Sequence, residues 1–235
     1  MERVKALVFD VFGTLVDWRG SIVRETRAIL SPLGVAIDWE KFADAWHSHY
    51  QPAMDEVRSS RSPFTTLDVL HRRNLDLTLE QFGLDALEDS ARAELTRAWH
   101  RLDAWPDTAP GLARLRTKYL LAPCSNGNIS IMVDLARRNG LIWDAILGAE
   151  VARDYKPKPV VYLSAAAAFD CAPAQTMMVA AHSYDLAAAA ALGFRTAFIA
   201  RPNEYGAGKG ERAASVPVDL AAASLTALAD RLLGA

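Results

Sequence analysis

The chain has 235 residues, 51% hydrophobic and 23% charged, which suits one α/β core with an insertion and is too apolar for a disordered protein. With a formal net charge of -2 and no long run of like charge, we expect a small-molecule partner rather than nucleic acid or a membrane. Its two cysteines, Cys124 and Cys171, lack CxxC or zinc-ligand spacing. No signal-type or membrane-spanning apolar segment is visible, so we expect a cytoplasmic protein.

The first predicted element is a strand over 4–11, rich in Val and Leu, as in a strand buried on both faces of a parallel sheet. The next stretch, 16–97, carries helical periodicity and almost no strand signal. Phe42, Ala45, Trp46, His49 and Tyr50 recur there at spacings of three and four, which favours an apolar helix stripe. We therefore expect 16–97 to be a helical cap domain, inserted into a core made of 1–15 and 98–235.

Beyond the insertion, short apolar runs alternate with helical segments. Strands are expected at 119–124, 145–147, 177–181 and 195–200, and helices at 129–139, 159–169 and 184–192. The polar stretch after Arg201 predicts a loop before a last short strand and helix. This alternation predicts an α/β fold with a doubly wound, Rossmann-like parallel sheet, whose ligands bind beyond the carboxyl ends of the strands.

Asp10 ends the first predicted strand and precedes a Gly-Thr turn. A strand-end Asp can simply cap a turn, and on its own that explanation has about even odds. The run LVFDVFGTLVD, however, resembles the first motif of the haloacid dehalogenase superfamily. The resemblance implies that Asp10 is the nucleophile.

Two further segments resemble the second and third motifs of this superfamily. Ser125 and Asn126 follow the strand predicted at 119–124, and their hydroxyl and amide can bind an anion without adding charge, although a Ser-Asn-Gly turn can also cap a helix. Lys156, followed by Pro, can hold an ammonium against Asp10, whereas Lys158 is expected at the surface. Tyr162 matches a pocket tyrosine of one branch of the family.

The fourth motif selects the branch. Phosphatases of the superfamily carry two acids spaced like Gly-Asp-x-x-x-Asp for Mg²⁺ and a second Asp two residues after the nucleophile. Here Asp185 remains, Ala181 stands four residues earlier and Phe12 follows Asp10. Asp185 could also be a simple helix N-terminal acid. A halide leaves as a stable weak base and needs neither a proton nor a metal ion, and the apolar Phe12 suits a dry pocket.

The sequence thus resembles the L-2-haloacid dehalogenases, the type II branch, over essentially the whole chain. Trp105-Pro-Asp and the Arg201-Pro-Asn-Glu-Tyr-Gly loop are weaker support. The resemblance implies (S)-2-haloacid hydrolysis without a cofactor or metal: Asp10 attacks C2 with inversion, and water activated by Asp185 and Lys156 hydrolyses the ester. It further implies that Thr14, Ser125, Phe12 and Tyr162 bind substrate, that Asn126 lines the halide site, and that a homodimer can form.

Two histidines depart from the branch pattern. His47 stands where an Arg after a Trp usually binds the departing halide; it could instead be an exposed helix residue. If it titrates near the ordinary histidine pKa of about 6.5, turnover would depend on pH there. His182 replaces a common Asn and is expected to reshape the substrate pocket or the hydrogen bonding near Asp185.

Three alternatives stay open. The same displacement chemistry could act on another activated carboxylic acid, such as one with a strained C–N bond. A Mg²⁺-dependent phosphatase would need the acids missing at positions 12 and 181. A non-catalytic binding protein would have had no need for Asp10, Lys156 and Asp185 together.

Overall fold

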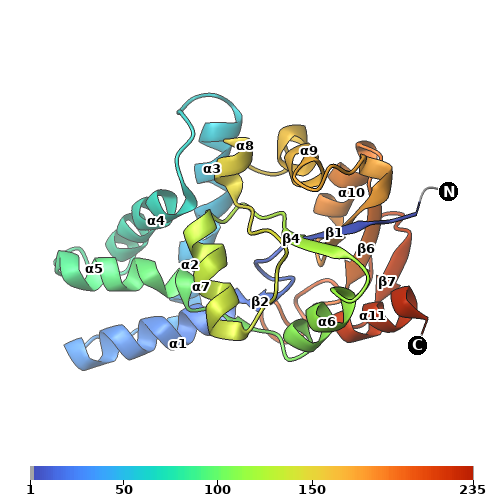
Figure 1. The fold of residues 1–235 in the computed structure, drawn as a ribbon. Coiled ribbons are helices and arrows are strands. Elements are labelled where there is room, and N and C mark those ends of the chain that lie inside the picture. Colours follow the sequence, from blue (N-terminus) through green and yellow to red (C-terminus); the bar gives the residue numbers. More distant parts are fainter. Residues whose placement is uncertain (1–2, 235) are drawn as a thin grey trace.

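The computed structural model of the protein describes residues 3–234, and its centre is a parallel five-stranded sheet (Figure 1). The order is β4 (Leu120–Pro123), β1 (Ala6–Phe9), β5 (Thr176–Ala180), β6 (Arg195–Ile199) and β7 (Leu220–Ala222). Phe9 of β1 aligns with Pro123 on one side and Val179 on the other. The chain therefore leaves β4, β1 and β5 at the same edge of the sheet.

Helices cover both faces of this sheet, as predicted for a doubly wound fold. In Figure 1, α9 (Pro159–Ala167) and α10 (Ser183–Ala191) lie above it, and α6 (Thr108–Leu115) and α11 (Leu225–Leu233) lie below it. The alternate residues Leu7 and Val8 of β1 belong to different hydrophobic clusters, and both are fully buried. The Val/Leu-rich first strand therefore supplies both faces of the core.

The segment between β1 and β4 contributes helices that gather beside the sheet in Figure 1. They are α1 (Trp18–Leu30), α2 (Trp39–Ser48), α3 (Tyr50–Arg58), α4 (Leu67–Gln81) and α5 (Asp89–Thr96), with 3-10 turns η1 (Ser31–Leu33) and η2 (Arg97–His100). A short ribbon, β2 (Val16–Asp17) with β3 (Asp103–Ala104), pairs the two ends of this segment. Within residues 3–234, no helix is long and apolar enough to cross a bilayer.

The remaining elements complete the core. They are α7 (Ile129–Asn139), α8 (Ala149–Ala152) and the 3-10 turn η3 (Pro173–Gln175). The predicted helices at 129–139, 159–169 and 184–192 are confirmed within one or two residues, and the last short strand and helix, predicted without bounds, are β7 and α11. The first strand is shorter than predicted, since regular pairing covers only Ala6–Phe9.

Two predicted elements are wrong. The strand expected at 145–147 is a loop, because the Asp144 carboxylate accepts the backbone N–H of Leu121 at 2.9 Å and takes the place of a neighbouring strand at the edge of β4. The apolar stripe from Phe42 to Tyr50 spans two helices that meet at His49. Pro52 explains the break, because it lacks an N–H and its ring would clash with the carbonyl of Ser48 in a continuous helix.

Candidate active site

The carboxylate of Asp10 lies just past β1 and is held by groups from three other segments. Its Oδ1 accepts a hydrogen bond from Lys156 Nζ at 2.8 Å, and its Oδ2 accepts one from Thr14 Oγ1 at 2.6 Å. Thr14 Oγ1 in turn accepts the backbone N–H of Ala181 at 2.8 Å, which fixes the direction of the Thr14 hydroxyl. Burial opposes ionisation, but Lys156 and His182 outweigh it and hold the pKa of Asp10 well below its usual range.

Lys156 also pairs with Asp185, so one ammonium serves two buried carboxylates. Nζ lies 2.5 Å from Asp185 Oδ2, and the hydroxyl of Tyr162 donates to Asp185 Oδ1 at 2.5 Å. Burial disfavours the charged lysine, yet the two carboxylates raise its pKa well above its ordinary value. Burial raises the pKa of Asp185, with Lys156 opposing the shift. This acid is therefore better suited than Asp10 to accept a proton.

The second motif positions the backbone of this lysine. Asn126 Oδ1 accepts the N–H of Lys156 at 2.8 Å, and Arg58 from α3 donates to the carbonyl of Lys156 at 2.6 Å. Ser125 Oγ accepts the N–H of Gly127 at 3.1 Å. The structure thus brings Asn126 to the Lys156 loop, while Ser125 is buried at the same edge in a turn-forming contact. Lys158 is exposed, as expected.

Phe12 forms part of an aromatic wall beside Asp10. Its ring meets Tyr50, His71 and Trp99 edge-on, at centroid distances of 6.4, 6.4 and 5.8 Å. Burial lowers the pKa of His71 to about 3, so this histidine is neutral at pH 7. The wall therefore provides a dry surface without an acid at position 12. Among the described residues, the side-chain nitrogens of His71 and Trp99 have no hydrogen-bond partner.

His47 lies in this aromatic layer, stacked between two rings. Its ring is 4.0 Å from Trp18 and 5.5 Å from Tyr50, between centroids. Burial lowers the pKa of His47 to about 4. His47 is thus half-buried rather than an exposed helix residue, and its lowered pKa favours a neutral imidazole at pH 7. Trp46 is buried in the helix stripe and donates to the carbonyl of His71 at 3.0 Å.

His182 contacts Asp10 itself, whereas the sequence predicted an effect on the substrate pocket or on the hydrogen bonding near Asp185. Its Nδ1 lies 3.1 Å from Asp10 Oδ2, and its Nε2 lies 3.0 Å from both carboxylate oxygens of Glu204. Glu204 lies in the Arg201-Pro-Asn-Glu-Tyr-Gly loop, which was weaker support for the family resemblance, and no role was predicted for this acid. A single acid in a polar, Gly-rich loop gives no periodic signal, so only the folded chain brings it to the site.

The two weaker family features meet each other beneath the site. Arg201 forms a bidentate pair with Asp107, with both distances at 2.9 Å, and donates to the carbonyl of Thr14 at 2.8 Å. Trp105 donates its indole N–H to the carbonyl of Gly13 at 2.9 Å. These contacts hold the loop after β6 and the turn after β1 together.

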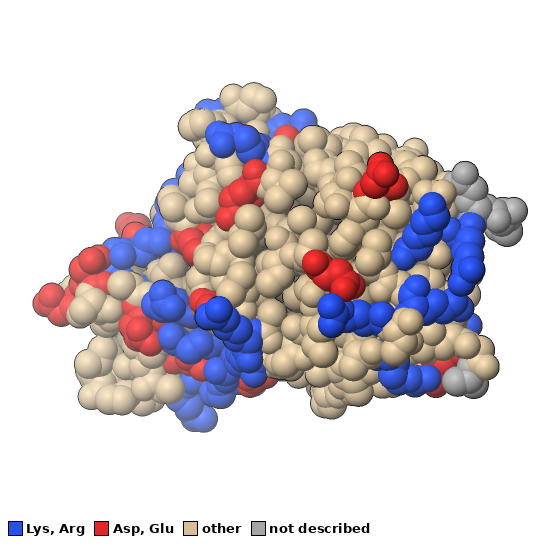
Figure 2. Space-filling model, in the orientation of Figure 1, with Lys and Arg blue, Asp and Glu red and all other residues tan. Residues whose placement is uncertain are grey.

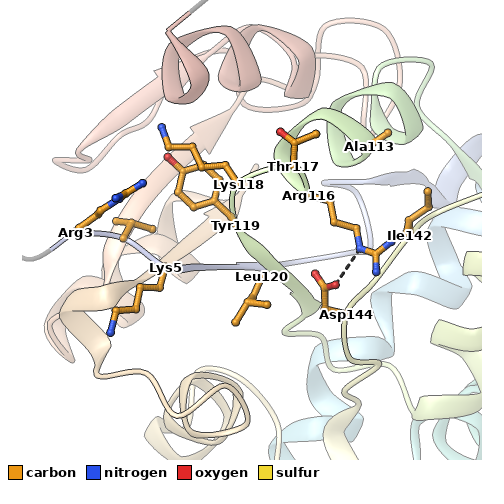
Figure 3. A pocket seen from close by; sticks show the side chains of 11 residues that line it. Arg3, Lys5, Ala113, Arg116, Thr117, Lys118, Tyr119, Leu120, Ile142 and Asp144 are labelled. Carbon is orange, nitrogen blue, oxygen red and sulfur yellow. Dashed lines mark hydrogen bonds and ion pairs between the residues drawn. The ribbon is translucent and has the colours of Figure 1, made fainter.

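A groove of about 750 Å³ lies outside the Lys156 loop. It is bounded by Arg58 and Arg61 of the α3 end, by Pro157 and Lys158, and by Tyr184 of α10. Two of its lining residues, Pro157 and Tyr184, are the sequence neighbours of Lys156 and Asp185, so the groove lies beside the site. A second pocket, of about 780 Å³, lies where β1 and β4 begin, lined by Lys5, Lys118 and Leu120 among others (Figure 3). It is at the opposite edge of the sheet from Asp10.

Known proteins provide an independent comparison. A family model described as haloacid dehalogenase-like hydrolase matches residues 4–193. (S)-2-haloacid dehalogenase 1 of Pseudomonas sp. (strain CBS-3) is 30% identical over 87% of this chain and 89% of its own. Two solved L-2-haloacid dehalogenases resemble the structure. PA0810 is 45% identical, with a TM-score of 0.94, and the match covers 99% of this chain and 100% of PA0810. The defluorinating Rha0230 is 42% identical, with a TM-score of 0.95, and the match covers 98% of this chain and 95% of Rha0230. The chain belongs to the haloacid dehalogenase-like hydrolase family.

Proposed function

We propose that the protein is an (S)-2-haloacid dehalogenase that hydrolyses short 2-haloalkanoic acids to 2-hydroxy acids. One observation carries this proposal: the ionised Asp10 accepts a hydrogen bond from the ammonium of Lys156 at 2.8 Å, while Phe12, two residues further on, belongs to the aromatic wall. A phosphatase of the superfamily would carry acids at positions 12 and 181, but this chain has Phe12 and Ala181 there. The names and the high identity of the relatives support the same substrate class.

The reaction follows from this geometry. Asp10 attacks C2 of the substrate opposite the carbon–halogen bond, the halide leaves with the bonding electron pair, and C2 is inverted. The product of this step is an ester between Asp10 and the acid. Water then attacks the ester carbonyl carbon, with Asp185 as the proton acceptor, and returns Asp10 as a carboxylate. In this proposal Thr14, Ser125, Asn126 and Tyr162 hold the substrate or the catalytic groups in place.

The halide site is proposed on neutral groups. With its pKa lowered to about 4, His47 is uncharged at pH 7 and can donate only a neutral N–H to a departing halide. Asn126, whose Oδ1 accepts the N–H of Lys156, would supply its amide N–H groups as the second neutral donor. The insertion 16–97 would act as the cap that closes the dry pocket, in a cytoplasmic enzyme.

The test is halide release from the separate enantiomers of 2-chloropropionate, with EDTA present. We expect release from the L enantiomer and a loss of at least about 10⁴-fold in Asp10→Asn. Lys156 keeps its pair with Asp185 in this variant, which favours folding. Asp154→Asn is the matched control, because among the described residues the Asp154 carboxylate accepts a hydrogen bond only from the N–H of Tyr155.

The same assay decides between the alternatives. Activity on p-nitrophenyl phosphate that requires Mg²⁺ would favour a phosphatase. If no short haloacid releases halide but another activated carboxylic acid is hydrolysed, the leaving group of the natural substrate is not a halide. Release that survives Asp10→Asn would contradict the proposed nucleophile.

A further inference from the structure

The imidazole of His182 is placed between two buried carboxylates, Asp10 and Glu204. Both ring nitrogens lie within 3.1 Å of a carboxylate oxygen. A carboxylate only accepts hydrogen bonds, so a histidine that bonds to one at each nitrogen donates at both and is an imidazolium. Burial alone would lower the pKa of His182, but Asp10 and Glu204 raise it well above 6.5.

Glu204 is held in place from several directions. Its Oε1 also accepts the indole N–H of Trp18 at 3.2 Å, and the residue is 3% exposed. Gly13 has a φ of +80°, and a Cβ at this position would lie 2.0 Å from Glu204 Oε1. Only glycine at position 13 therefore leaves room for the Glu204 carboxylate. The Glu204 carboxylate therefore packs directly against the turn that follows Asp10.

The two oxygens of Asp10 have different partners. Oδ1 accepts one described hydrogen bond, from Lys156, while Oδ2 accepts two, from Thr14 and His182. The less occupied Oδ1 keeps a lone pair for attack on the substrate carbon. Once Oδ1 has formed the ester, Oδ2 is its carbonyl oxygen, and the two donors already point at it.

We propose that His182 and Thr14 form the oxyanion site for hydrolysis of the Asp10 ester, with Glu204 as the positioning residue that keeps His182 in place. This inference rests on the proposed dehalogenase function. It assigns His182 to the second chemical step, ester hydrolysis, in which negative charge develops on Asp10 Oδ2. A cationic donor stabilises that charge more than a neutral one does.

The step balances as follows. The water oxygen bonds to Cγ of Asp10, one water proton passes to Asp185, and the carbonyl π pair moves to Oδ2, between His182 and Thr14. When this pair returns, the Cγ–Oδ1 bond breaks, and the hydroxy-acid oxygen takes the proton from Asp185. The second water proton leaves to solvent as the Asp10 carboxylate re-forms beside Lys156.

The first step, displacement of the halide, needs no oxyanion donor, because attack by Oδ1 removes negative charge from the Asp10 carboxylate. Loss of His182 or Glu204 should therefore slow ester hydrolysis by about 10²-fold and displacement of the halide far less. In such variants the ester becomes the species that accumulates. A defect that only disturbed the fold would lower both steps together.

The experiment is rapid mixing of L-2-chloropropionate with the wild type, Glu204→Gln and His182→Asn. Chloride and the intact mass of the quenched protein are followed together. We expect both variants to release a burst of one chloride per active site and to carry the 1-carboxyethyl ester of Asp10. Glu211→Gln is the control: it lies in the same loop, and its contacts are with Ser183. It should show no ester accumulation.

The pH profile provides a second readout, independent of how well His182→Asn folds. Without Glu204 the imidazolium has one carboxylate partner fewer, so ester hydrolysis in Glu204→Gln should fall as the pH rises through a lowered His182 pKa. The other titratable groups near His182 and Glu204 are Tyr184, stacked on His182 at 5.6 Å, Tyr205, Asp17 and the neutral His47. Both tyrosines are exposed, and partial desolvation together with nearby carboxylates, Asp10 among them, raises the pKa of each above the ordinary value of about 10, so both keep their protons at neutral pH.

The outcomes separate cleanly. Equal slowing of chloride release and turnover, with no ester on the quenched protein, would overturn the oxyanion assignment. A flat pH profile for ester hydrolysis in Glu204→Gln, equal to the wild type, would overturn the role of Glu204. Absence of chloride release from wild-type protein would instead refute the proposed dehalogenase activity.

Discussion

At the scale of single residues, His47 is the clearest departure from its relatives' pattern. Burial between Trp18 and Tyr50 removes water from the imidazole, and the positive His182 adds repulsion, whereas Asp44 only partly compensates. A cation at position 47 is therefore disfavoured in this pocket. The positive charge that meets the nucleophile comes from Lys156 and His182 instead.

This predicts how His47→Gln changes the pH dependence of stability. The folded pKa of about 4 lies below the unfolded value near 6.5, so protonation favours the unfolded chain as the pH falls through this window. Relative to His47→Gln, the wild type should lose about 2 kcal/mol of unfolding free energy between pH 7.5 and pH 5. Urea titrations at both pH values measure this difference. A constant difference, or an inflection of turnover near pH 6.5 that the variant lacks, would contradict a neutral His47.

At the scale of elements, η2 joins the helices of the insertion to α7 through His100. Its Nε2 lies 2.9 Å from Asp68 of α4, and its Nδ1 lies 2.7 Å from Asp134 of α7. Asp68 also accepts from Asn128, at the start of α7, at 2.8 Å. Burial disfavours the imidazolium, but the two carboxylates outweigh it and raise the pKa of His100.

His100→Gln should therefore destabilise the protein in a pH-dependent way. Because the folded pKa is above the unfolded one, the charged contacts stabilise fully below about pH 6.5 and are lost as the pH rises through the raised value. We expect a loss of about 1.5 kcal/mol at pH 6 and a smaller one at pH 9, from denaturant unfolding. The relative rates of halide release and ester hydrolysis should not change in His100→Gln, since His100 does not contact the residues around Asp10. A loss that grows with pH would refute the charged contact.

The helices and strands also differ in how well their positions could be predicted from the sequence. Buried strands and capped helices were predictable because their apolar patterns are local, as for Val8 and Gly140. The strand at 145–147 failed because one side chain, Asp144, replaced strand pairing. The motif residues Asp10, Lys156 and Asp185 were found because their local sequences resemble motifs of the family. Asp10 and Asp185 also follow β1 and β5, which are neighbours in the parallel sheet, whereas Lys156 follows α8 and reaches the site only through the fold. Glu204, Tyr50, His71 and Trp99 were missed, since their roles depend on contacts between distant segments.

At the scale of the whole molecule, charge poses a problem for an enzyme that binds an anion. The net charge is -2, and the proposed substrate is a carboxylate. In Figure 2 the centre of the face carries few charges, Lys and Arg are mixed with Asp and Glu at the left, and Lys and Arg gather at the right, on the side where the N-terminus lies. The groove beside Lys156 is locally basic, because it carries Arg58, Arg61 and Lys158 against the single acid Asp55. Local charge of this kind raises the concentration of an anionic substrate near the groove.

Reversing two of these charges tests the groove as the path to the site. We expect Arg61→Glu combined with Lys158→Glu to lower kcat/KM by about tenfold at low salt, with kcat unchanged, and salt should remove most of the difference because it screens exposed charges. Lys5→Glu combined with Lys118→Glu is the matched control: it changes the net charge equally, at the pocket in Figure 3. If both pairs lower kcat/KM alike, net charge alone governs association. If only the groove pair does, the substrate reaches Asp10 between α3 and α10.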